Sequence, residues 1–123
     1  MKRILTFIVL FNGLIFAQSN LYFLSNPSPS PDGKNIVFTY HEDLWIVPAD
    51  GGNAYRLTGM QGIETNAVYS PDGKWIAFNG SQDGNANVYI IPVNGGKIKQ
   101  LTFYDGNDQV SYWSWDSKYI YFN

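Results

Sequence analysis

The chain has 123 residues, a formal net charge of −2 and no cysteine. Nucleic-acid binding needs a basic surface that neutralises phosphates, but the only basic pair, Lys2 and Arg3, lies at the extreme N-terminus, so no nucleic-acid partner is predicted. The absence of cysteine excludes disulfides, thiolate metal sites and a cysteine nucleophile.

Residues 1–17 are predicted to be a secretory signal peptide. Lys2 and Arg3 form a positive start, an apolar run follows at 4–16, and the small residue Ala17 ends the segment. The apolar run is shorter than the roughly 20 residues that cross a bilayer as a helix. We therefore expect a periplasmic or secreted protein that keeps no membrane span after signal removal.

Residues 18–28 are predicted to be a lead-in arm before the first repeat. Pro27 and Pro29 stand at alternate positions and cannot donate to a β-ladder, which favours an edge strand or an extended arm.

One turn sequence then recurs at spacings of about 40 residues, a period typical of repeat folds. Ser-Pro-Asp-Gly-Lys occupies residues 30–34 and 70–74, and Ser-Trp-Asp-Ser-Lys occupies 114–118. Proline fixes φ at a turn corner, and glycine tolerates positive φ, so the first two copies predict short hairpin loops with a left-handed glycine. Ser117 replaces that glycine in the third copy, where a different turn type is expected.

Short apolar strands surround each turn, and the aromatic share of 17% is typical of β-sheet surfaces. The predicted strands of the first repeat are 36–40, 44–47 and 55–58, and those of the second are 66–69, 75–78, 88–91 and 99–102. Four short strands in about 40 residues are the content of one propeller blade.

The predicted fold is therefore all-β: a β-propeller fragment over residues 29–123. It comprises one complete four-stranded blade at 29–65, a second at 66–109 and the start of a third at 110–123. Because a propeller needs at least four blades to close, we expect these residues to be the N-terminal piece of a longer protein.

Several polar clusters resemble functional sites but favour turns. His41, Glu42 and Asp43 are adjacent in sequence, which does not make side chains converge as acid–base or metal chemistry requires. Residues 83–87 alternate oxygen ligands as a calcium loop does, yet the glycine and glutamate that such a loop needs later are Val88 and Asn94. Residues 105–108 are interpreted as a connection between blades.

The remaining candidates have structural interpretations too. Asn79 begins a formal glycosylation sequon, which matters only in a glycosylating host. The serines before the turns lack a Gly-x-Ser-x-Gly context. The tryptophans are predicted to pack mostly between blades rather than to form a carbohydrate-stacking surface; they are Trp45, Trp75, Trp113 and Trp115. We thus predict no catalytic, cofactor-binding or metal-binding residue in this chain.

With these repeats in view, the chain resembles the propeller repeat shared by TolB and the tricorn protease. Within that superfamily it is most similar to the N-terminal propeller of bacterial tricorn protease homologues, over about residues 26–123. The residues that carry the likeness form an ordered series along both blades and into the third: 43–48, 51–52, 56–58, 69–78, 83–85, 88–89, 92, 95–96, 108–110 and 113.

The resemblance implies an N-terminal gate, filter and scaffold for a large serine peptidase that cuts peptides. The family's catalytic serine and histidine lie in a C-terminal protease region after a PDZ-like domain, and no position here matches them, so we expect this fragment alone to be inactive. The implied partners are the remaining blades and protease region of the same chain, peptide substrates and, as an open alternative, further copies of the chain. Two other interpretations are a non-catalytic periplasmic TolB-like protein-binding propeller and the propeller of a metal-dependent amidohydrolase.

Overall fold

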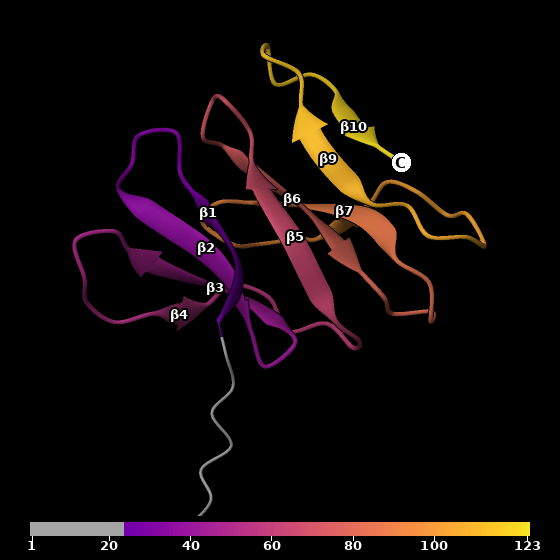
Figure 1. Cartoon of the computed structure of the whole chain (residues 1–123), viewed down its shortest axis with the longest axis horizontal. Helices are drawn as coiled ribbons and strands as arrows, with labels where there is room; N and C mark the ends of the chain where they lie inside the picture. Colours follow the sequence, from indigo (N-terminus) through magenta and orange to yellow (C-terminus); the bar gives the residue numbers. More distant parts are fainter. Residues whose placement is uncertain (1–23) are drawn as a thin grey trace, which may run out of the picture.

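A computed structural model describes residues 24–123, which form ten strands in three antiparallel sheets (Figure 1). The predicted signal peptide at 1–17 and the beginning of the lead-in arm lie outside the described residues. Within residues 24–123, no helix has the length and apolar character needed to cross a membrane. The all-β propeller fold predicted from the sequence is confirmed, with two four-stranded sheets followed by the first strands of a third.

Each of the two complete sheets is a meander of four strands in chain order. The first sheet contains β1 (Ser25–Pro29), β2 (Asn35–Tyr40), β3 (Asp43–Pro48) and β4 (Tyr55–Arg56). The second sheet contains β5 (Glu64–Tyr69), β6 (Trp75–Gly80), β7 (Asn87–Pro92) and β8 (Lys99–Gln100). The two-stranded third sheet pairs β9 (Val110–Trp113) with β10 (Ile120–Phe122).

The segment predicted as a lead-in arm is partly a strand. β1 pairs with β2 and lies at one edge of the first sheet. Proline has no backbone N–H to donate, and an edge strand tolerates this because one of its sides has no partner strand. Of the two alternatives given for the lead-in at 18–28, an edge strand or an extended arm, residues 25–28 therefore form the edge strand.

The hydrophobic core lies between the first and second sheets. Its members come from both sheets and are almost completely buried: Val37, Leu44, Ile46, Ala67, Tyr69, Ile76, Phe78, Tyr89 and Ile91. A second, smaller cluster joins the second sheet to the third around Ala77, Val88 and Val110. Side chains of a strand alternate between its two faces, so β6 directs Ile76 and Phe78 toward the first sheet and Ala77 toward the third.

The tryptophans do not form a common blade-to-blade core. Trp115 is 93% exposed and Trp75 is 37% exposed, so the packing prediction is wrong for these two. Trp115 occupies the corner of a turn, beyond the end of its strand, and no neighbouring sheet covers it there. Trp113 is partly buried, and its indole N–H donates to the carbonyl of Val68 at 3.0 Å, which ties the third sheet to the second.

Candidate functional site

The three repeated turns lie at the same end of the three sheets (Figure 1). We call this end the turn face and define it by residues 30–34, 70–74 and 114–118. All three turns close by the same backbone hydrogen bond, from the amide of the fourth residue to the carbonyl of the first serine, at 2.9 Å in each. The three sheets thus present one repeated structure side by side.

Side chains reinforce each turn in the same way. The serine hydroxyl donates to the aspartate Oδ1 at 2.6, 2.6 and 2.7 Å along the chain. The same Oδ1 accepts the lysine backbone N–H at 3.1, 3.1 and 3.3 Å. The serine Oγ accepts the N–H of the residue after the lysine at 3.0, 2.9 and 2.9 Å. The serines are therefore structural, in agreement with their interpretation as turn residues.

The third turn corrects one expectation. Gly33 and Gly73 have φ of 70°, as predicted, but Ser117 adopts φ of 59° and closes the same turn. A non-glycine residue in the left-handed region costs about 1 kcal/mol. Ser117 Oγ accepts the backbone N–H of Asp72 at 3.0 Å, a contact between the second and third turns that glycine cannot make.

The turn aspartates carry negative charge at neutral pH. The pKa values of Asp32, Asp72 and Asp116 are all lowered, first by the serine hydroxyl bond, which favours the ionised carboxylate. Lys74 lies 4.0 Å from the Asp72 carboxylate and Lys118 lies 3.5 Å from that of Asp116. No lysine or arginine of the described chain lies within 4.0 Å of the Asp32 carboxylate.

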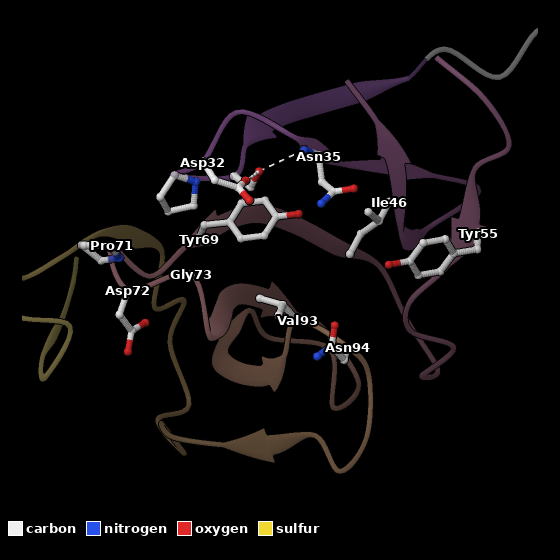
Figure 2. A pocket seen from close by; sticks show the side chains of 12 residues that line it. Asp32, Asn35, Ile46, Tyr55, Tyr69, Pro71, Asp72, Gly73, Val93 and Asn94 are labelled. Atoms are coloured by element: carbon white, nitrogen blue, oxygen red, sulfur yellow. Dashed lines mark hydrogen bonds between the residues drawn. The ribbon is translucent and has the colours of Figure 1, made fainter. Parts of the chain in front are cut away.

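A hollow, which we call the interblade pocket, opens at the turn face between the first and second sheets (Figure 2). Its volume is about 500 Å³. Its lining comes from both sheets, from the first two repeated turns and from the turn after β7: Ser30, Pro31, Asp32, Asn35, Ile46, Tyr55, Tyr69, Pro71, Asp72, Gly73, Val93 and Asn94.

A second hollow, the central hollow, is lined by residues of all three repeated turns: Pro31, Pro71, Asp72, Trp115, Asp116 and Ser117.

Tyr69, at the end of β5, lies in the middle of the interblade pocket (Figure 2). Its side chain is 8% exposed, and its buried hydroxyl has no hydrogen-bond partner. Burial raises the pKa of Tyr69 to about 12, and the nearby Tyr55 and Asp32 add to the rise. Sequence reasoning did not identify this group, because its burial depends on how two sheets stack.

Amide side chains connect β1 and β5, the first strands of their sheets, with Gln109, the residue immediately before β9. Asn26 Nδ2 donates to Asn66 Oδ1 at 3.2 Å, and Asn66 Nδ2 donates to Gln109 Oε1 at 2.8 Å. Asn26 and Asn66 both have φ of 52°, at bulges in β1 and β5. These first strands therefore form a polar inner edge that runs through all three sheets.

Two buried polar residues lie at the joints where adjacent sheets meet: Glu64, which no sequence motif indicated, and Asn79, which was considered only as a glycosylation sequon. Glu64 is completely buried, and its carboxylate accepts hydrogen bonds from the backbone of Leu44 and Met60, at 3.3 and 3.0 Å, and from the Thr58 hydroxyl. Burial raises the pKa of the Glu64 carboxyl despite these bonds. Thr58 belongs to the repeated Leu-Thr pair: its Oγ1 accepts the N–H of Leu44 at 2.9 Å, and in the second repeat Thr102 Oγ1 accepts the N–H of Val88 at 2.9 Å.

Asn79 is the second joint residue. It is 1% exposed, its Nδ2 donates to the carbonyl of Asp108 at 2.5 Å, and its Oδ1 accepts the N–H of Val110 at 3.0 Å. A side chain held in this way is inaccessible for glycosylation, so Asn79 has a structural role and is not a glycosylation site. Asn79 occupies the position of Thr39 one repeat later, and the Thr39 hydroxyl donates to the carbonyl of Glu64 at 3.0 Å. This repeated position is the sequence signal for the structural role of Asn79.

The other sequence candidates are turns. His41 and Glu42, at φ of 50° and 69°, form the two-residue connection between β2 and β3. Residues 83–87 and 105–108 bind each other: Asn85 Nδ2 donates to the carbonyl of Asp105 at 2.6 Å, and Ala86 N–H donates to Asn107 Oδ1 at 2.9 Å. Across residues 24–123, histidines and carboxylates form no cluster of three or more that could hold a metal ion.

Comparisons with known proteins agree with this geometry. The model of the tricorn protease N-terminal β-propeller domain family matches residues 22–123. Tricorn protease homolog 1 of Streptomyces coelicolor is 35% identical over 60 residues, covering 49% of this chain and 6% of that protein. The structure of TolB from Acinetobacter baumannii has a TM-score of 0.69 at 30% identity, over 80% of this chain and 26% of that one.

The crystal structure of the tricorn protease itself is similar, with a TM-score of 0.67 and 27% identity over 78% of this chain and 10% of that chain. In each of these similar proteins, the matched part is a small share of the whole length.

Proposed function

The chain belongs to the family of tricorn protease N-terminal β-propeller domains, and on that premise we propose that it begins the gating propeller of an exported tricorn-like serine peptidase. The observation that supports this most is the family match, which extends over all the described residues. The catalytic region, the remaining blades and the peptide substrates belong to this proposal.

The turn face supplies the chemistry of a gate. Trp115 stands almost fully exposed beside Pro31 and Pro71 at the central hollow, with two ionised aspartates next to it. An aromatic ring and rigid prolines offer contact surface to a peptide chain without depending on its sequence. The amide side chains along the inner edge, Asn26, Asn66 and Gln109, offer hydrogen bonds to a peptide backbone in the same manner.

The test is peptide hydrolysis by the complete protein and its Trp115→Ala variant. We expect kcat/KM to change several-fold for peptides of ten or so residues and to stay constant for a chromogenic dipeptide, because only long substrates contact the gate. Absence of hydrolysis by the complete protein overturns the proposal. Equal changes in kcat/KM for both substrates would contradict the gating role.

A second candidate function is protein binding without catalysis. The similarity to TolB from Acinetobacter baumannii, at least as high as that to the tricorn protease, favours it. In that case the complete protein would hydrolyse no peptide, and the coding sequence would end soon after the propeller closes.

Export is part of the first proposal. It rests on the composition of residues 1–17, and N-terminal sequencing of the mature protein tests it. A mature chain that begins at Gln18 supports export, and one that retains Lys2 and Arg3 contradicts it.

A further inference from the structure

The interblade pocket contains a hydrogen-bonding group that the protein does not use. The Tyr69 hydroxyl is buried without a partner, although buried polar groups in folded proteins are almost always paired. Figure 2 shows the Tyr69 ring crossing the pocket, with its hydroxyl directed toward the side where Asn35 and Ile46 lie. The group is therefore positioned to meet a molecule inside the pocket.

The first repeated turn differs from the other two in one respect. Its aspartate, Asp32, forms no ion pair with a described lysine or arginine, whereas Asp72 and Asp116 each lie within 4.0 Å of the lysine two residues later. Asp32 is also close enough to Tyr69 to influence its ionisation. A carboxylate without an ion pair within 4.0 Å and an unpartnered hydroxyl thus line one hollow.

The rest of the lining determines which ligand fits. Two ionised aspartates line the pocket, and no lysine, arginine or histidine does, so the pocket favours a cation. Ile46 and Val93 supply apolar contact for an alkyl stem, and the hydroxyl of Tyr55 is directed toward the pocket in Figure 2. A volume of about 500 Å³ lies within the range of ligand sites.

We propose that the interblade pocket binds a guanidinium or ammonium group on an alkyl stem, the chemistry of an arginine or lysine side chain. The cation donates to the Asp32 carboxylate and to the Tyr69 hydroxyl oxygen, and its stem packs between Ile46 and Val93. This site adjoins the central hollow, with which it shares Pro31, Pro71 and Asp72, and the proposal does not depend on peptidase activity.

Calorimetric titration of the complete protein tests the proposal with Nα-acetyl-arginine methylamide and its neutral citrulline analogue. We expect the arginine probe to bind at least about tenfold more tightly, because a charge-assisted hydrogen bond is lost in the analogue. Free L-arginine identifies the source: weaker binding than the blocked probe indicates a peptide, and equal binding indicates a small molecule.

Matched variants localise the binding. Asp32→Asn should weaken the arginine probe about tenfold and Tyr69→Phe about threefold, whereas Asp116→Asn, in the equivalent third turn, should leave binding unchanged. Tyr69→Phe keeps the ring, and because the lost hydroxyl has no partner, the variant should unfold at a temperature no lower than that of the wild type. Tyr89→Phe, which removes the second unpartnered buried hydroxyl of residues 24–123, controls for this effect.

The proposal is overturned if the two probes bind equally, if Asp32→Asn leaves binding intact, or if no binding occurs up to roughly 10 mM probe. A lower unfolding temperature for Tyr69→Phe would also overturn it, because the hydroxyl would then have a partner within the protein or a fixed water.

Discussion

The second and third sheets carry the same turn but differ greatly in burial. Phe78 in β6 is completely buried and stacks on Tyr89, with ring centroids 5.7 Å apart. Phe122, at the equivalent place in β10, is 48% exposed. The turn hydrogen bonds are nearly identical in the two sheets, so the turn forms from local sequence alone. Burial comes instead from the sheet that stacks on each face.

The largest effect should come from truncating one phenylalanine of this pair. We expect Phe78→Ala to lower the free energy of unfolding of the 123-residue chain by about 4 kcal/mol, because it opens a cavity in the core. Phe122→Ala should cost less than about 1 kcal/mol. Urea unfolding followed by tryptophan fluorescence measures both. Equal losses would mean that the third sheet is packed as well as the second.

The next effect distinguishes the first joint, the contact between the first and second sheets, from the second joint, the contact between the second and third sheets. Glu64→Ala leaves the Thr58 hydroxyl and the Met60 N–H without their acceptor, while the Leu44 N–H keeps its bond to Thr58 Oγ1 at 2.9 Å, and we expect a loss of about 3 kcal/mol. Asp108 occupies the equivalent place at the second joint, and only its backbone bonds across that joint, so Asp108→Ala should cost less than about 1 kcal/mol. Thermal unfolding of the two variants decides whether the first joint is the stronger.

Glu64 also gives the first joint a pH dependence. Its pKa is raised in the folded state, so between its ordinary value of 4.5 and the raised value the folded chain binds more protons than the unfolded chain. The stabilisation of the folded chain by the Glu64 carboxyl is therefore complete below pH 4.5 and is lost as the pH rises through the raised pKa. The turn aspartates have the opposite sign, because their pKa values are lowered.

The difference in stability between the wild type and Glu64→Gln isolates this contribution. We expect the advantage of the wild type to shrink as the pH rises from 4.5 toward neutrality. A constant difference across this range would show that burial does not perturb the Glu64 carboxyl.

The smallest effects concern the turn itself. A Cβ at Gly73 would meet no atom within 4 Å, so Gly73→Ala should cost only the left-handed backbone penalty of about 1 kcal/mol. Ser117→Ala should cost about as much, because it loses the bond from Asp72 and keeps the strained φ. Ser117→Gly loses the bond but relieves the strain, and a net change near zero in chemical denaturation is expected. A large loss for Ser117→Gly would contradict this balance.

Sequence reasoning succeeded where the determinants are local. The repeated turns, the strand order of the second sheet and the left-handed Gly33 and Gly73 follow from neighbouring residues. It failed at Ser117, where a bond to a different sheet offsets the backbone penalty. It failed at Trp115 because this residue lies in a turn, outside the strand whose side chains pack against the neighbouring sheet.

The candidate sites were beyond the sequence for a related reason. Glu64 and Asn79 look like ordinary strand residues, and only stacking of adjacent sheets buries them. Tyr69 belongs to the second sheet and Asp32 to the turn between two strands of the first, so no spacing along the chain brings them together. Comparing the repeats position by position would have shown that Asn79 takes the place of Thr39, which is the one local signal available.

The most direct test of the proposed function is to treat the complete protein with a fluorophosphonate probe and map the labelled residue. Our account predicts that a single serine, outside residues 1–123, is labelled and that labelling abolishes peptide hydrolysis. A complete protein that remains unlabelled and hydrolyses no peptide would contradict the peptidase proposal and favour a binding propeller.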